Sequence, residues 1–159
     1  MQAYLYIGLQ ARIFGAKSPQ ALELNNRRSL HCTLMYSAIS GRRTPKMQCR
    51  QQTYTAEIIS VAYIPHADCT CLILKNSRPL QARHDYFANF GFSLGYEFEP
   101  HITVSRGNSV CKWVELIGQH VDLSNEYFQL LMKEPNDPLK QQAYAKTKVT
   151  GFPSYDFGA

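Results

Sequence analysis

The chain has 159 residues, of which 45% are hydrophobic, and its formal net charge is +5. This length predicts one domain over residues 1–159 with a sizeable core, and the apolar content argues against a disordered protein. No apolar run approaches the ~20 residues that cross a bilayer, residues 1–4 lack a signal-peptide pattern, and the five cysteines cannot all pair within the chain. We therefore expect a cytoplasmic protein with reduced thiols and no membrane partner.

The first half of the chain predicts a strand, a helix and a second strand. Residues 3–9 alternate in the way typical of a strand, with two tyrosines on one face and, on the core face, Leu5, Ile7 and Leu9. The tyrosines therefore face solvent or a ligand cleft. Ser18 as N-cap and Pro19 at the first helical position predict a helix that ends at residues 25–28, and a strand follows at residues 30–36.

The second half predicts the same order of elements around a hairpin. Residues 52–64 and 70–75 are β-rich, and a turn at residues 66–68 connects them. The remaining expected elements are a helix at 78–91, a strand at 101–104, a short helix at 111–116 and a strand at 127–133. Residues 139–159 form a polar tail that is either flexible or a lid over a cleft.

A four-residue pattern occurs twice in the expected strands. His31-Cys32-Thr33-Leu34 and His101-Ile102-Thr103-Val104 both read His–apolar–Thr–apolar. Because side chains alternate along a strand, the histidine and threonine of each copy share one face. The repeated strand–helix–strand order predicts an α+β domain with two similar lobes that face each other across a crevice. The plainer interpretation is two core histidines, each bonded to a neighbouring backbone group.

Two histidines and two hydroxyl groups around one point suit the cleavage of a phosphodiester. An unperturbed imidazole titrates near pH ~6.5, so one ring can accept a proton while the other donates one. Threonine hydroxyls can donate to the non-bridging phosphate oxygens. No metal ion or other cofactor is needed when the nucleophile is a ribose 2′-hydroxyl. The spacing of another candidate ligand set fits no familiar zinc site; that set is His66, Cys69, Cys71 and His84.

The paired motifs resemble the signature of the two-histidine (2H) phosphoesterase superfamily. Residues 31–37, 82–86 and 96–105 further resemble the phage anti-CBASS phosphodiesterases, which degrade the cyclic oligonucleotide messengers of bacterial CBASS immunity. The resemblance implies a 2H phosphoesterase-like bilobal fold, with two facing antiparallel sheets, a central cleft and outer helices. It also implies cleavage of 3′–5′ bonds in cyclic di- or trinucleotides, in the cytoplasm of a host bacterium.

The resemblance assigns roles to particular residues. Its catalytic set falls on His31, Thr33, His101 and Thr103. Aromatic side chains sandwich the substrate bases in that family, and a carboxylate and a C-terminal aromatic residue accompany them. The matching substrate-binding positions are Tyr6, Tyr63, Glu97, Glu134 and Tyr144. Tyr63 stands where the family pattern has an indole, a departure that affects base stacking.

Other functions fit the same motifs. One is a phosphodiesterase acting on RNA 2′,3′-cyclic ends, although the modest and dispersed positive charge gives it little support. Another is a module that sequesters cyclic nucleotides without cutting them, and a third is a structural protein in which the repeat is a coincidence. The expected partner is the cyclic oligonucleotide, with no duplex nucleic acid and no obligate protein partner.

Overall fold

The computed structural model describes residues 2–39, 49–92, 94 and 97–133. Its elements are β1 (Gln2–Ile13), α1 (Pro19–Asn25), β2 (His31–Ala38), β3 (Tyr54–Ile64), β4 (Cys69–Leu74), α2 (Arg78–Ala88), β5 (His101–Arg106), α3 (Val110–Trp113), a 3₁₀ turn (Val114–Leu116) and β6 (His120–Lys133). The α+β class is confirmed, and so is the repeated order, as β1–α1–β2 and β4–α2–β5. Glu134, Tyr144 and the tail at 139–159 lie outside the described residues.

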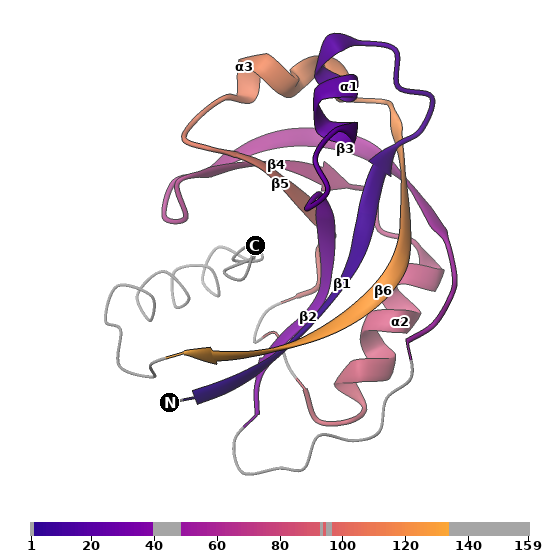
Figure 1. Ribbon diagram of the computed structural model, residues 1–159, viewed down its shortest axis with the longest axis vertical. Coiled ribbons are helices and arrows are strands. Elements are labelled where there is room, and N and C mark those ends of the chain that lie inside the picture. The colour runs from indigo at the N-terminus through magenta and orange to yellow at the C-terminus, as the bar shows by residue number, and fades with distance from the viewer. Residues whose placement is uncertain (1, 40–48, 93, 95–96, 134–159) are drawn as a thin grey trace.

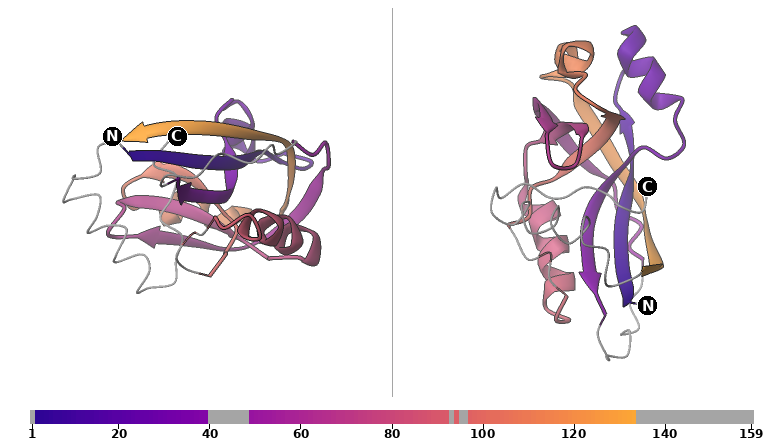
Figure 2. Two further views of the ribbon diagram at one scale, coloured as in Figure 1. Left: turned by 90° about the horizontal axis from the view of Figure 1, so that it is seen from below. Right: turned by 90° about the vertical axis from the view of Figure 1, so that its left-hand side faces the viewer.

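The described strands form one six-stranded antiparallel sheet in the order β2-β1-β6-β3-β4-β5, where two separate sheets were expected. The reason is the length of β3, whose residues 54–57 pair with β6 while residues 58–64 pair with β4. One strand thus joins two half-sheets. The sheet is strongly curled (Figures 1 and 2), and its edge strands β2 and β5 come to lie side by side.

Most of the larger apolar cluster packs on one face of this sheet. The expected core residues of β1 are at most 1% exposed; they are Leu5, Ile7 and Leu9. Both motif strands contribute their apolar residues to the same cluster, namely Cys32, Leu34, Ile102 and Val104. Because side chains alternate, the His–Thr pairs of β2 and β5 lie on the opposite side, away from this core.

Serine caps begin the two helices that precede the motif strands. The Ser18 hydroxyl accepts a hydrogen bond from the Ala21 amide in α1, and the Ser77 hydroxyl accepts one from the Leu80 amide in α2. Each helix also has a proline in its first turn, where a missing N–H costs nothing. α1 and α3 lie together at one end of the molecule (Figure 1), and α2 packs beside β2.

The last strand begins at His120, seven residues before the position that its sequence indicates. Val121 and Leu123 alternate as core residues. Asn125 then adopts a left-handed backbone (φ 52°), and the register between β1 and β6 shifts there. The bulge breaks the alternation, so the two parts of β6 do not read as one strand.

Candidate active site

The two histidines of the repeated motif bond to equivalent backbone carbonyls, each two residues before the histidine, and have the same tautomer. Nδ1 of His31 lies 2.6 Å from the carbonyl oxygen of Ser29, and Nδ1 of His101 lies 3.2 Å from that of Glu99. A carbonyl oxygen only accepts hydrogen bonds, so this geometry assigns a proton to each Nδ1. In the neutral rings the lone pair is then on Nε2. Both residues are buried, with exposed fractions of 8% and 3%.

Thr33 is held by a tyrosine of the neighbouring strand. The Tyr6 hydroxyl lies 3.0 Å from the Thr33 Oγ1, and the Tyr6 ring meets the edge of His31 with centroids 5.8 Å apart. The structure therefore brings this expected substrate-binding residue to the catalytic candidates. Tyr6 is only 2% exposed, which suits it to support the pair from within the sheet.

Thr103 has a different neighbour, the thiol of Cys71 on β4. Its Oγ1 lies 3.5 Å from the Cys71 Sγ, which in turn lies 3.7 Å from the Cys69 Sγ. The two thiols share a face of β4, because side chains two residues apart on a strand point the same way. That face is the one of Thr103, and a small apolar cluster with Ile64 and Ile73 extends across it.

The two halves of the candidate site are tied together by Arg27. This residue follows α1 and precedes β2, and its Nη1 donates to the Val104 carbonyl of β5. Its guanidinium also lies over the Trp113 ring, 5.6 Å from the centroid, and beside the Glu23 carboxylate at 3.5 Å. Arg27 therefore holds the start of β2, the strand of Thr33, against β5, the strand of Thr103.

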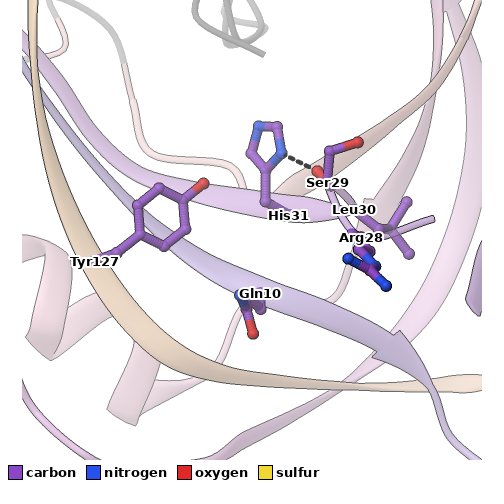
Figure 3. Close-up of a pocket in the computed structure, with 6 residues that line it drawn as sticks. All are labelled: Gln10, Arg28, Ser29, Leu30, His31 and Tyr127. Atoms are coloured by element: carbon purple, nitrogen blue, oxygen red, sulfur yellow. Dashed lines mark hydrogen bonds between the residues drawn. The ribbon is translucent and has the colours of Figure 1, made fainter.

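A pocket of about 180 Å³ opens beside His31. Its walls are Gln10, Arg28, Ser29, Leu30, His31 and Tyr127. His31 and Gln10 stand between Tyr127 and Arg28 along this pocket (Figure 3). Tyr127 and Arg28 are residues that sequence reasoning missed. The available signal for Tyr127 is Gly8, because a glycine inside an apolar strand often marks a close approach by another group.

Tyr63 lies on the other face of the sheet from the candidate catalytic residues. Ala62, the residue before Tyr63, pairs with Cys71 of β4, and Cys71 pairs with Thr103 of β5. Ala62 and Thr103 therefore share one face of the sheet, and Tyr63 points to the other face. The Tyr63 hydroxyl donates to Asp68 over 2.8 Å, and this bond raises the pKa of the phenol. The structure does not bring Tyr63 to the site.

The carboxylates before β5 do not line the pocket beside His31. Glu97 is exposed. Burial raises the pKa of Glu99, and the negative charge of Glu97 raises it further. Glu99 serves the site through its backbone carbonyl, which accepts the His101 bond.

The zinc set drawn from the sequence is not assembled. Nδ1 of His84 donates to the Leu34 carbonyl over 2.7 Å, and its ring stacks on Phe98 with centroids 4.5 Å apart. Within residues 2–39, 49–92, 94 and 97–133, no group of three or more His, Cys, Asp or Glu side chains is arranged to hold a metal ion.

Residues 14–137 match the model of the family described as "Anti-CBASS protein Acb1". The chain belongs to the Acb1 family. This membership indicates an anti-CBASS function in phage. No curated protein matches the chain.

The Acb1 match includes both motif strands, α2 and all of β6. It begins after β1, so Tyr6, Gly8 and Gln10 lie outside the matched residues, and so does Tyr144. In the described part of this Acb1-family protein the longest helix, α2, has 11 residues, and none of its helices is long and apolar enough to cross a membrane.

Proposed function

We propose that this Acb1-family protein is a metal-independent phosphodiesterase of the 2H phosphoesterase superfamily. It cleaves 3′–5′ bonds in cyclic di- or trinucleotide messengers and thereby counteracts CBASS immunity in the host bacterial cytoplasm. The two half-sheets that share β3 correspond, in this proposal, to the two lobes of the superfamily fold.

The arrangement of the two histidines is the observation that supports this function best. Each donates from Nδ1 to the carbonyl two residues before it, and each has a threonine two residues after it on the same face. Equivalent groups on β2 and β5, which lie side by side, suit a symmetric acid–base pair on either side of one phosphate.

In the proposed reaction, Nε2 of one neutral histidine removes the proton from a ribose 2′-hydroxyl. The 2′ oxygen attacks the adjacent phosphorus, and the bond between phosphorus and the 5′ oxygen breaks. The other histidine, protonated, delivers its Nε2 proton to the leaving oxygen. Thr33 and Thr103 donate hydrogen bonds to the non-bridging oxygens, where negative charge increases in the transition state. The products are a 2′,3′-cyclic phosphate end and a 5′-hydroxyl.

The experiment is chromatography of products from a panel of cyclic di- and trinucleotides incubated with the protein in EDTA. We expect cleavage to a 2′,3′-cyclic phosphate end, or to a 3′-phosphate where a water molecule has then hydrolysed that cyclic ester. We also expect a bell-shaped pH profile and a rate roughly 10²–10⁴-fold lower in His31→Ala and His101→Ala. His120→Ala is the matched control, since His120 is an exposed histidine at the start of β6. Activity that EDTA abolishes, or that survives His101→Ala, would contradict the proposal.

The same assay separates the alternative functions. An enzyme for RNA ends turns over an oligonucleotide with a 2′,3′-cyclic phosphate faster than any cyclic dinucleotide. A sequestering protein returns its ligand unchanged after the complex is denatured.

A further inference from the structure

The pocket beside His31 continues into a second, larger pocket of about 400 Å³. The two share Gln10, Arg28 and Leu30, so they form one groove along the start of β2. The residues that line only the larger pocket are Ala11, Arg12, Asn25, Arg27, Ser124 and Asn125. No carboxylate is among the described residues that line either pocket, whereas three arginines are.

The three arginines differ in what already balances their charge. Arg27 is held by Glu23 and the Val104 carbonyl. Arg12 stands directly across from Asp122 in the register of β1 and β6. Arg28 is exposed, borders both pockets, and has no ion-pair partner among the described residues. Its guanidinium is therefore the cation of the groove that a ligand can engage.

Two amide side chains add hydrogen-bond donors near Arg28. The Asn125 Nδ2 donates to the Gln10 Oε1 over 2.8 Å, which orients the Gln10 amide and makes its NH₂ group the donor available to a ligand. Gln10 pairs with His31 on one side and Ser124 on the other, so it stands between the catalytic candidate and the larger pocket. An uncompensated guanidinium beside an oriented amide suits a phosphate group, which accepts two parallel hydrogen bonds from arginine.

We propose that Arg28, with Gln10, binds a second phosphodiester of the substrate while the scissile one lies at the His–Thr pairs. This inference rests on the proposed function, because it assumes that a phosphodiester is bound at His31. It specifies the ligand class as one with at least two phosphodiester groups, such as a cyclic dinucleotide.

The test is calorimetric binding to His101→Ala protein, in which the ligand stays intact. Arg28→Ala is compared with Arg28→Lys, and Arg78→Ala is the control, because Arg78 is exposed at the start of α2 and its loss changes the net charge equally. The ligands are a cyclic dinucleotide, with two phosphates, and a linear dinucleoside monophosphate, with one.

We expect Arg28→Ala to weaken binding of the cyclic dinucleotide about tenfold or more, and binding of the monophosphate by less than about twofold. Arg28→Lys restores part of the affinity, and Arg78→Ala leaves it unchanged. Equal losses for both ligands, or no loss for the cyclic one, overturn the inference.

The proposed function is tested separately by cleavage in protein with all histidines intact. Binding that depends on Arg28 without any cleavage refutes the enzyme and keeps the subsite. Cleavage, together with binding that Arg28→Ala leaves unchanged, keeps the proposed enzyme and refutes the Arg28 subsite. Absence of both binding and cleavage refutes both.

Discussion

The ring of Tyr127 lies directly over Gly8. A Cβ atom at Gly8 would be 2.8 Å from the Tyr127 hydroxyl oxygen, 2.9 Å from its Cζ and 3.1 Å from Cε1 of Tyr6. The Tyr6 and Tyr127 rings contact each other with centroids 5.9 Å apart. The absence of a side chain at Gly8 therefore makes room for both rings. The Tyr6 ring contacts the His31 ring, and Tyr127 lines the same pocket as His31.

We predict that Gly8→Ala displaces Tyr127 and destabilises the protein by about 1–3 kcal/mol, because the added methyl group has no room. Urea unfolding measures the change, and cyclic dinucleotide cleavage by the folded variant should also fall. The control is Gly8→Ala in a Tyr127→Ala background, where most of the penalty should disappear. An equal penalty in both backgrounds would show that Tyr127 is not the obstacle.

The hydrogen bond between Tyr6 and Thr33 predicts a positioning role for the Tyr6 hydroxyl. Tyr6→Phe keeps the ring against His31 and removes the bond to Thr33. Since one such bond is worth about 0.5–1.5 kcal/mol, we expect kcat to fall roughly 2- to 10-fold while KM changes little. Tyr4→Phe, on the same face of β1, should leave kcat unchanged. A change in KM alone would instead indicate that the hydroxyl contacts the substrate.

A buried ion pair fastens α2 to β6. Arg83 donates to both carboxylate oxygens of Glu126 over 2.8 and 2.6 Å, and the side chains are 7% and 0% exposed. The bond to Glu126 raises the pKa of Arg83, so the arginine stays charged. Glu126→Ala leaves that charge buried without its partner and should cost about 3–5 kcal/mol of unfolding free energy.

Glu115→Ala, at an exposed carboxylate, is the control for this ion pair and should cost little. A loss below about 1 kcal/mol in Glu126→Ala would mean that the Arg83 charge reaches solvent by another route.

Glu99 predicts a pH-dependent contribution to stability. Burial raises the pKa of its carboxyl group, and the charge of Glu97 raises it further. The folded protein therefore binds this proton more tightly than the unfolded chain, so stability is greatest below the unfolded pKa of ~4.3 and falls as pH rises through the folded pKa. Glu99→Gln stays neutral, so its Tm relative to the parent should increase between about pH 4 and pH 7.

Glu97→Gln, which removes only the secondary cause, should act in the same direction with a smaller effect. A difference in Tm between Glu99→Gln and the parent that is constant with pH would show that Glu99 does not titrate differently in the folded state.

Local signals in the sequence predict most elements correctly, because they depend on neighbours in the chain. The Ser18 cap, the Leu5–Leu9 alternation and both motif strands are of this kind. Tyr63 illustrates what such signals miss. The register between β3 and β4 shifts between Ile58 and Ser60, so Ile58 and Val61 both face the core. That bulge moves Tyr63 to the side away from the cleft, and the sequence of β3 alone does not reveal it.

The groove beside His31 was missed for a related reason. Gln10, Arg28 and Tyr127 come from distant parts of the chain, and only the pairing of β1 with β2 and β6 brings them together. A single arginine or glutamine in the sequence does not indicate a binding site until its neighbours across the sheet are known.

The two motifs lie on the two edge strands of one sheet, so the geometry of the candidate site depends on every strand pairing between them. His31 and His101 are separated by every strand pairing in the order β2-β1-β6-β3-β4-β5. A slip of one residue in any of these pairings would turn one His–Thr pair toward the core. If the protein is the proposed enzyme, its specific activity should therefore report the fraction of molecules in which all five strand registers are correct.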